Sequence, residues 1–517
     1  MAKNYLIGIG GTGARVIEAM TFICAAGYGP EELNVFLVDP DAGNGNLTRT
    51  KTLLSLYKEC KGRFVPFEPN GGLFRTRIKS PEAFIWEIFE NKDTTLSSYI
   101  NYQNLRQTRK DLAGLAEVLF TESELLTRLN EGFRGHPAIG AVVMSSPPEE
   151  KQPWKTLWEE IEHATRVNEV RVFLVGSIFG GTGAAGIPTF GASEMIKLRE
   201  NARVGDQSKV LLGGALVMPY FTFDSADGAD GQMFVTSADF PIATKAALHF
   251  YNTKDLAFDQ LYFIGDSLAQ RVGKFSPGSL KQENLPHYIE MVTSLAACDF
   301  FDQPDNVETA DKLYFTACRD GEELDWQALP VSRDTHLKSE KQNRFKSLMT
   351  TMAVFSYVLN TYGESKLAQK YEEILDAWYL DHFWPGGSED EERKSNPTFV
   401  ENEELIKKVS SFTKKFLTWI CAIDDESRKV QLVDRSKLIN GDIESGKEPE
   451  LFDPVENRMN IARALKESSL DRDFACFLNR DLNQVRIKDR TMTAGNKFIN
   501  LFYEAAKKYC LENFTIK

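Results

Sequence analysis

The chain is poor in the residues that build metal centres and disulfide frameworks. Its 517 residues include seven cysteines and six histidines, and these form neither a C-x-x-C pair nor an H-x-x-x-H pair. Structural zinc sites, zinc hydrolases and secreted disulfide scaffolds all depend on closely spaced ligands of these types. The scattered cysteines therefore predict reduced, mostly buried thiols, and the histidine spacing argues against a zinc hydrolase.

Positive charge is also scarce. Lysine and arginine number 61 against 74 aspartates and glutamates, which gives a net charge of −13. A dedicated nucleic-acid binder needs a basic face that displaces counterions, so the composition argues against that class. The sequence also lacks an apolar run long enough for a signal peptide or a membrane span, and we expect a cytoplasmic protein.

What is present is typical of a globular protein of two or three domains, with 42% apolar and 26% charged residues. Up to about residue 305, short apolar runs alternate with helical patterns, which predicts an α/β fold with a parallel sheet. Residues 47–135 are mixed and mostly helical, and we expect a helical insertion there. Residues 306–517 predict a mostly α-helical C-terminal domain. The predicted strands are 5–9, 34–38, 139–144, 170–175, 210–217 and 260–264.

The first motif that carries chemistry is G-I-G-G-T-G over residues 8–13, between the first predicted strand and a helix. Glycines let the backbone turn tightly and approach a phosphate, while the following helix start offers unpaired amides and a positive dipole end. The motif fits a Rossmann dinucleotide site, in which Asp39 after the second strand would bind a ribose hydroxyl. The same glycines would also allow close packing of strand and helix.

A second glycine-rich turn, G-G-T-G over residues 180–183, follows another buried strand. Two such turns on parallel strands face the same edge of the sheet, where open α/β folds bind ligands. A Rossmann site needs one of them, whereas two converging turns fit a nucleotide held by amides from both sides. The P-loop motif G-x-x-x-x-G-K-[ST] is absent, so backbone amides and a metal would have to stabilise the phosphates.

The paired turns resemble those of the tubulin and FtsZ superfamily of GTPases. The signature loop of that family reads G-G-G-T-G-[ST]-G, and F-G-G-T-G-A-A over residues 179–185 shares its central G-G-T-G. The family's first loop corresponds to residues 8–16, with Arg15 in place of an asparagine. The resemblance covers about residues 1–305 outside the expected insertion. It describes a divergent bacterial tubulin-like protein rather than an orthologous division protein.

Further segments support the resemblance. L-V-D-P-D-A over residues 37–42 is similar to the second loop, which lies near the phosphates and the metal. Residues 145–146 fall at the third, phosphate-sensing loop, and Y-F-I-G-D over residues 262–266 is similar to a strand end near the guanine. The nucleotide-binding residues that the resemblance and the motifs imply are Gly10, Gly11, Thr12, Gly13, Arg15, Asp39, Asp41, Ser145, Ser146, Gly180, Gly181, Thr182, Gly183, Asp266 as a reader of the base, and His287, which would stack on it.

In this family an acidic loop after the central helix of one subunit completes the GTPase site of the next. The matching helix is predicted over residues 288–301, and its end carries Asp299, Asp302 and Asp305 without the family spacing N-x-D-x-x-D. A carboxylate at that place orients the attacking water. Each of these aspartates fits a helix-end or surface role equally well.

The resemblance thus implies a tubulin-like protein that binds GTP or GDP, with Mg²⁺, and self-associates head to tail into cytoskeletal filaments as a slow GTPase. One alternative is a non-catalytic, nucleotide-dependent interaction protein whose helical C-terminal domain binds a protein partner. Another is an NAD-dependent Rossmann oxidoreductase, which leaves the second glycine turn without a role.

Overall fold

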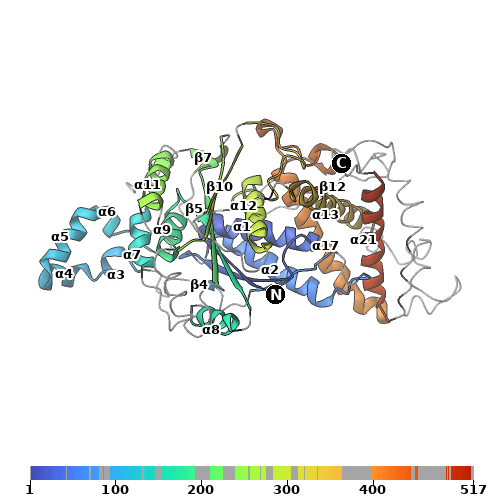
Figure 1. Cartoon of the computed structure of the whole chain (residues 1–517), viewed down its shortest axis with the longest axis horizontal. Helices are drawn as coiled ribbons and strands as arrows, with labels where there is room; N and C mark the ends of the chain where they lie inside the picture. The colour runs from blue at the N-terminus through green and yellow to red at the C-terminus, as the bar shows by residue number, and fades with distance from the viewer. Residues whose placement is uncertain are drawn as a thin grey trace.

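The chain is described by a computed structural model, which Figure 1 shows in full. The part that the structure describes is residues 2–513 without 42, 69–71, 81–84, 87–92, 130–132, 134, 146–153, 167, 192–209, 225–238, 254–256, 268, 275–282, 304–312, 320, 333, 335, 364–396, 444–448, 452–484, 486, 488 and 490.

The centre of the molecule is an eight-stranded parallel sheet (Figure 1). Seven strands lie in the order β3-β2-β1-β5-β6-β8-β10, and β4 pairs with the end of β2 beside β3. After β1, the strands β2 and β3 are added on one side of it, and β5, β6, β8 and β10 are then added on its other side. Such a switch point is where open α/β sheets bind ligands, at the carboxyl ends of the strands. The strands are β1 (Lys3–Ile9), β2 (Glu32–Val38), β3 (Arg77–Lys79), β4 (Ile85–Trp86), β5 (Val170–Ser177), β6 (Val210–Val217), β8 (Gln260–Asp266) and β10 (Leu313–Arg319).

The buried strands contribute alternately to two hydrophobic cores, one on each face of the sheet. In β1, Leu6 belongs to the first core, whereas Tyr5, Ile7 and Ile9 belong to the second. Successive side chains of a strand point to opposite faces, so a strand covered on both sides is apolar along its length. This explains the continuous apolar runs of the sequence.

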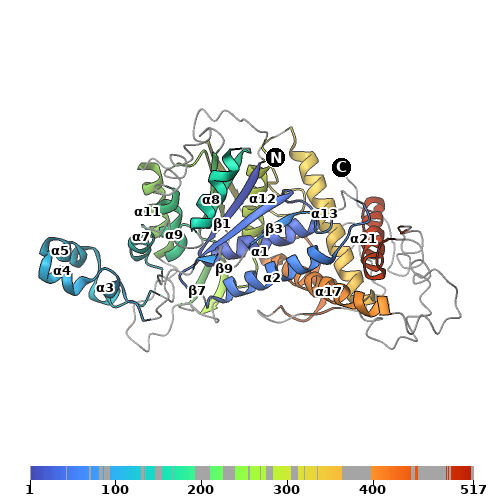
Figure 2. The same cartoon turned by 90° about the horizontal axis from the view of Figure 1, so that it is seen from below.

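Helices cover both faces (Figures 1 and 2). The first core is formed with α1 (Gly10–Ala26), α2 (Gly45–Arg63), α12 (Tyr288–Phe301), α13 (Lys338–Val358), α17 (Pro397–Ile423) and α21 (Ala494–Asn513). The second is formed with α7 (Pro137–Met144), α8 (Trp154–Thr165) and α9 (Gly181–Thr189), while α11 (Phe240–Thr253) contributes to both. The smaller elements are α18 (Arg435–Leu438), the short helices Leu359–Gly363 and Glu426–Arg428, and the paired strands β7 (Phe221–Asp224) with β9 (Gln270–Lys274) and β11 (Ile439–Asn440) with β12 (Glu450–Leu451).

The predicted fold class is confirmed: a parallel-sheet α/β core with flanking helices precedes a helical C-terminal region. The C-terminal helices complete the first core. On α1, Phe22 has its ring centroid 5.5 Å from Phe412, 5.8 Å from Phe416 and 5.1 Å from Trp419, all on α17. The strand β10, beyond residue 305, also joins the main sheet beside β8.

The segment expected to be a helical insertion has two parts. Its first part belongs to the core, because α2 packs on α1 and the strands β3 and β4 pair with β2. Its second part holds four short helices that extend away from the body in both views (Figures 1 and 2). We call this part the helical arm; it consists of α3 (Leu96–Tyr99), α4 (Tyr102–Thr108), α5 (Lys110–Leu119) and α6 (Glu122–Leu125).

The strand predicted over residues 139–144 is wrong, because this segment is the helix α7. Pro137 stands at the start of the helix, where its missing N–H costs nothing and its fixed φ favours helix. The following residues are apolar without interruption, a pattern that fits a buried strand and a buried helix equally. The helix packs between α9 and the helical arm through Ile139, Val143 and Met144.

Candidate functional site

The two glycine turns lie side by side at the carboxyl edge of the sheet. The first leads from β1 into α1 and the second from β5 into α9, and β1 and β5 are neighbours in parallel register. Gly10 has a φ of +72°, a conformation that favours glycine. A Cβ atom on Gly10 would lie 3.2 Å from Cβ of Thr182 and 3.4 Å from the backbone nitrogen of Gly183. The structure therefore brings the two predicted motifs into contact.

Neither helix start at this edge is capped by a side chain. Ile9 precedes α1 and Gly180 precedes α9, and neither makes a capping hydrogen bond. The first turn of each helix also lacks an acidic residue. A helix start exposes several unpaired N–H groups and the positive end of the helix dipole. Two such starts side by side form a place where an anion is stabilised by the backbone alone.

Two glycines of the motifs are required for packing. A Cβ on Gly13 would lie 2.6 Å from the carbonyl carbon of Gly8, and one on Gly183 would lie 2.5 Å from the backbone oxygen of Ser177. Contacts this short do not occur in proteins, so these positions bring each helix onto its strand. At these two positions the glycines allow close packing of strand and helix, and this role leaves the backbone amides at the sheet edge in place.

Gly181 and Gly11 differ in what surrounds them. A Cβ on Gly181 would lie 3.0 Å from the nitrogen of Gly135 and 3.1 Å from Cβ of Phe133, so this position faces the segment before α7. A Cβ on Gly11 would meet the side-chain amide nitrogens of Asn44 and Asn46 at 3.6 Å, an ordinary contact distance. Gly11 is therefore the glycine at which a side chain would enter the edge without disturbing the core.

The segment after β2 is held by its own carboxylates and amides. Asp39 accepts a hydrogen bond from the N–H of Asp41 at 3.0 Å, and Asp41 accepts one from the N–H of Gly43 at 3.0 Å. Both aspartates are buried. Burial raises the pKa of Asp39 to about 7. The hydrogen bond from the N–H of Asp41 and the charge of Lys51 oppose this shift, whereas the negative charge of Asp41 adds to it. A charged Asp39 is costly here unless a cation approaches it.

Two asparagines that sequence reasoning missed follow this segment, and their side chains lie beside Gly11 of the first turn. Asn44 caps α2 by accepting hydrogen bonds from the N–H groups of Asn46, at 2.9 Å, and Leu47, at 3.4 Å. The side-chain oxygen of Asn46 accepts one from the N–H of Asn284 at 3.0 Å. The available signal was N-x-N over residues 44–46, shortly after the acidic segment Asp39–Asp41, since asparagine is a preferred helix cap.

Arg15 is part of a buried network beneath the first turn. Its Nε lies 3.0 Å from Oε1 of Glu290, and its Nη2 donates to the hydroxyl of Tyr220. The Tyr220 hydroxyl in turn donates to Glu290 Oε1 at 2.9 Å. Burial raises the pKa of Glu290, while Arg15 opposes that shift. The charge of Arg15 is thus compensated inside the protein, and its contact with the nucleotide stays a prediction.

His287 has a structural role in this network. Its Nδ1 accepts the N–H of Ile289 at 3.1 Å, and its own N–H donates to Glu290 at 3.0 Å, which caps α12. The imidazole is fully buried, with its ring centroid 4.8 Å from that of Tyr220. Burial, together with Arg428, Arg15 and Arg319, lowers the pKa of His287 well below its usual value. It is a neutral cap and does not present a ring to a base.

Asp266 stands where the resemblance places it, at the carboxyl end of β8. Its Oδ2 lies 3.0 Å from Nη2 of Arg319, the residue opposite it on β10, and its side chain is fully buried. The guanidinium of Arg319 also lies over the ring of Tyr288, 4.8 Å from its centroid. In this arrangement Oδ2 is bound to an internal cation, and the role of Asp266 as a reader of the base stays a prediction.

The serines of the expected third loop follow α7. Ser145 is exposed and its hydroxyl donates to the carbonyl of Val142 at 2.9 Å. Ser146 lies outside the described residues. Because α7 is a helix, Ser145 ends a helix instead of following a strand at the carboxyl edge.

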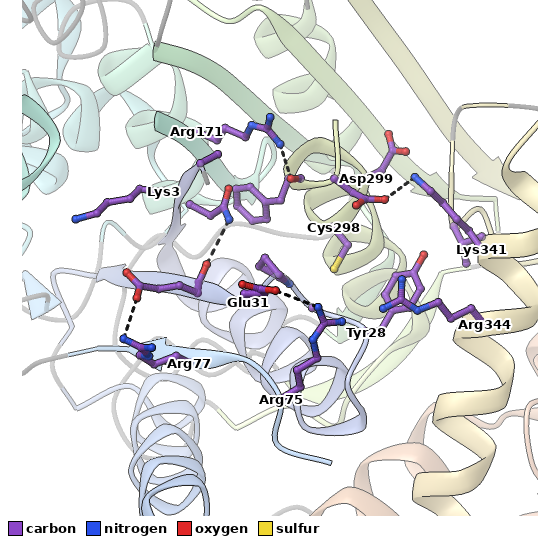
Figure 3. Close-up of a pocket in the computed structure, with 18 of the residues that line it drawn as sticks. Lys3, Tyr28, Glu31, Arg75, Arg77, Arg171, Cys298, Asp299, Lys341 and Arg344 are labelled. Atoms are coloured by element: carbon purple, nitrogen blue, oxygen red, sulfur yellow. Dashed lines mark hydrogen bonds and ion pairs between the residues drawn. The ribbon is translucent and has the colours of Figure 1, made fainter. Parts of the chain in front are cut away.

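The aspartates at the end of α12 lie at the opposite, amino edge of the sheet. There, a cavity of about 570 Å³ is lined by Asp299 and Asp302 together with residues at the start of β1 and of β2 (Figure 3). Asp299 accepts hydrogen bonds from Tyr262 at 2.9 Å and Ser332 at 3.2 Å, and Asp302 pairs with Lys341 at 2.8 Å. Asp305 lies outside the described residues. Within one subunit, Asp299 and Asp302 are thus separated from the glycine turns by the length of α12.

No cluster of three or more histidine, cysteine, aspartate or glutamate side chains is arranged to hold a metal ion among the described residues. Mg²⁺ commonly uses one or two carboxylates together with phosphate oxygens, and Asp39 and Asp41 can supply such a set. Among the described helices, none combines the length and apolarity needed to cross a bilayer.

Comparison with known proteins gives one kind of match. No family model matches the chain, and no curated protein matches it. Among solved structures, the chain is similar to CetZ2 from Haloferax volcanii, determined as a GTPγS-bound protofilament, with 14% sequence identity and a TM-score of 0.28. The match covers 60% of this chain and 64% of CetZ2, which is less than two thirds of that protein. At this TM-score the match does not add to the topology described above.

Proposed function

We propose that the chain is a tubulin/FtsZ-like protein that binds a guanine nucleotide at the carboxyl edge of its sheet. The observation that carries the proposal is the contact between two uncapped helix starts, where Gly10 approaches Thr182 and Gly183. The unpaired amides of both helix starts would compensate there for the missing P-loop lysine. The motif resemblance gives the guanine class.

The residues present fit this ligand. The amides at residues 10–13 and 180–183 would hold phosphates, and Asn44 and Asn46 border the same space beside Gly11. Asp39 and Asp41 would share a Mg²⁺ ion with the phosphates, and a cation there would favour the ionised form of Asp39. When bound, the metal would supply charge stabilisation of a leaving phosphate.

Hydrolysis would require a second subunit. Asp299 and Asp302 lie at the amino edge, away from the glycine turns of their own chain. Head-to-tail stacking would bring the amino edge of one subunit onto the carboxyl edge of the next, and a heterologous contact of this kind generates filaments. We therefore propose a slow GTPase that is activated by self-assembly. If these aspartates serve only their internal contacts, the protein is instead a nucleotide-dependent interaction module.

The NAD-dependent alternative is favoured by a separate observation. The strand order on both sides of β1 is also that of Rossmann dehydrogenases, and Asp39 follows the second strand, as their ribose-binding acid does. This interpretation explains the first glycine turn and gives no role to the second. Ligand preference therefore decides between the two.

The deciding experiment is titration calorimetry of nucleotide-free protein with GTP, GDP, ATP and NAD in the presence of Mg²⁺. We expect binding of GTP and GDP in preference to the others. The Gly11→Val variant should keep its melting temperature and lose affinity at least about tenfold, because a side chain would occupy the space in front of the amides.

The matched control is Gly62→Val, at a position on α2 where an added Cβ meets nothing within 4 Å. It should bind as the unaltered chain does. Binding of NAD alone, or full GTP affinity in a folded Gly11→Val protein, would overturn the proposal.

A further inference from the structure

The cavity at the amino edge of the sheet has an excess of positive charge in its lining. Its volume of about 570 Å³ is within the range of small-molecule sites. The whole chain has a net charge of −13, so the lining is opposite in sign to the molecule as a whole. The cationic side chains are those of Lys3, Arg75, Arg77, Arg171, Lys341 and Arg344, and the anionic ones are those of Glu31, Glu32, Asp299 and Asp302.

Two of the six cations have a role at the end of α12. Arg171 donates to the backbone oxygen of Phe301, and Lys341 lies 2.8 Å from the carboxylate of Asp302. The last turn of a helix has unpaired carbonyl groups and the negative end of the helix dipole, which cations stabilise. The fold therefore accounts for the charges of Arg171 and Lys341.

The arginines on the other side of the cavity are bound less firmly. Nη2 of Arg75 lies 3.5 Å from Oε1 of Glu31, and both side chains are partly exposed. Exposed ion pairs of this kind are weak, so another anion can compete for the arginine. Among the described residues, no carboxylate lies within ion-pair distance of Arg344. Its guanidinium lies over the ring of Tyr28 instead, 5.7 Å from the centroid.

The loop that carries Tyr28 and Glu31 is held in place by its surroundings. Gly27 ends α1 with a φ of +98°, and a Cβ there would lie 2.3 Å from the backbone oxygen of Gly72. The hydroxyl of Thr76 donates to the carbonyl of Pro30 at 2.7 Å. A cavity wall that is fixed in this way loses little conformational entropy when a ligand binds.

The two arginines reach this loop from different elements. Arg75 lies on the segment that leads into β3, and Arg344 lies on α13, and both side chains extend into the cavity (Figure 3). They contact residues 28 and 31, which are only three positions apart. A guanidinium binds two oxygens of a phosphate or carboxylate at once, so two of them at one short loop suit a group that concentrates negative charge.

We propose that this cavity binds a phosphate monoester of a small organic molecule, with the phosphate at Arg75 and Arg344. A phosphate monoester places almost two negative charges on one group at neutral pH, which a dicarboxylate distributes over two groups. The apolar part of the ligand would lie toward Cys298 and Val331, which also line the cavity. The inference goes beyond nucleotide binding at the carboxyl edge and does not depend on it.

The test is titration calorimetry of the full, nucleotide-free chain with phenyl phosphate at pH 7.5 and with a chelator of divalent cations. We expect one site per chain with a dissociation constant below about 1 mM. Arg75→Gln and Arg344→Gln should each raise that constant at least about tenfold, because each removes a charged donor to the phosphate. The melting temperature of Arg344→Gln should stay unchanged, since the side chain is exposed.

The matched control is Arg106→Gln on the helical arm, which replaces another exposed arginine that lies over a tyrosine ring, 5.9 Å from the centroid of Tyr102. It should bind phenyl phosphate as the unaltered chain does. Glu31→Gln should strengthen binding, because it removes the carboxylate that competes for Arg75. A purely structural role of these side chains would not produce opposite effects of the two kinds of variant.

Three outcomes would overturn the proposal: no binding of phenyl phosphate up to about 10 mM, full affinity in both Arg75→Gln and Arg344→Gln, or equally tight binding of succinate, which would indicate a dicarboxylate site. The Gly11→Val variant separates this cavity from the glycine turns. Phenyl phosphate binding that persists in Gly11→Val supports the cavity, whereas binding that only Gly11→Val abolishes would place the ligand at the nucleotide site and overturn the inference. A chain that binds phenyl phosphate in this way but no GTP would overturn the proposed function alone.

Discussion

At the scale of single residues, the ion pair of Arg15 and Glu290 connects the first glycine turn to α12. Both side chains are buried, and Tyr220 joins them through hydrogen bonds to each. Glu290 also accepts the N–H of His287 and so caps α12. Removal of one partner from such a pair leaves a buried charge without compensation, which costs more than the pair itself contributes.

We therefore predict that Arg15→Ala lowers the free energy of unfolding by about 3–5 kcal/mol, the range for a broken buried ion pair. Arg166→Ala is the control, because Arg166 pairs with Glu162 on the surface, 3.4 Å away, and such pairs contribute about 1 kcal/mol or less. Urea unfolding of both variants measures the difference. If both variants lost the same small free energy of unfolding, burial of Glu290 would not require the charge of Arg15. A folded Arg15→Met protein should still bind nucleotide, although the position of Arg15 in the first loop implies a contact with the ligand.

The carboxyl group of Asp39 predicts a dependence of stability on pH. Its pKa is raised to about 7 from 3.8, so the folded state retains a proton that the unfolded chain has lost between these values. Between these two pH values only the folded state binds this proton, so the free energy of unfolding falls as the pH rises from 3.8 to about 7. Above pH 7 the full cost of the buried charge is present, and below about pH 4 it is absent.

Asp39→Asn should remove this slope. We expect its melting temperature to exceed that of the unaltered chain by about 2–4 °C at pH 8 and by little at pH 4.5, as a shift of this size implies for a large chain. Differential scanning calorimetry at the two pH values, without nucleotide or metal, measures it. Equal effects at both pH values would mean that Asp39 is not protonated in the folded state. Added Mg²⁺ and nucleotide should reduce the advantage of the variant.

These residues also show what a sequence predicts at this scale. The glycine positions follow from local spacing, because a tight turn between strand and helix has few alternatives. The partners of Arg15 and Asp266 do not, since Glu290 and Arg319 come from elements more than 50 residues away. Nothing in the local pattern states that either charge is neutralised internally. The sequence therefore predicts both residues as ligand contacts, and the structure adds that each forms an internal ion pair.

At the scale of elements, prediction succeeded where the apolar period was unambiguous. The helix expected over residues 288–301 has these bounds in the structure, and the buried strands around residues 170–175 and 210–217 are confirmed. It failed over residues 139–144, where a continuous apolar run fits either element and Pro137 was the deciding signal. The short strands β3 and β4 have too few residues for any period, and only their pairing with β2 identifies them.

Elements of the C-terminal region pack onto the α/β core that precedes them. The sequence texture changes to a helical one after about residue 305. Yet β10 extends the main sheet, and α17 packs three aromatic side chains around Phe22 of α1. A parallel sheet must be covered on both faces, and α1 and α12 cover only part of the first. The C-terminal helices supply the rest, a requirement set by the fold and not by local sequence.

At the scale of the whole molecule, the two edges of the sheet carry different halves of the proposed GTPase site. The glycine turns lie at the carboxyl edge, and Asp299 and Asp302 lie at the amino edge beside the cavity of Figure 3. α12 runs from one edge to the other, with His287 at its start and Asp302 at its end. In the proposed mechanism one subunit does not complete the site alone, and turnover should depend on contact between subunits.

We predict that GTP turnover per subunit rises with protein concentration and that Asp302→Ala lowers it at least about tenfold, the scale of losing a water-positioning carboxylate, while GTP affinity stays unchanged. Asp442→Ala, at a surface aspartate 91% exposed, is the control. A mixture of Asp302→Ala with Gly11→Val should recover part of the activity, because the first still binds GTP and the second still offers Asp302. If turnover per subunit stayed constant with concentration and the mixture recovered no activity, hydrolysis would take place within one subunit. No turnover at any concentration, with GTP bound, would leave the nucleotide-dependent interaction module as the function of this chain.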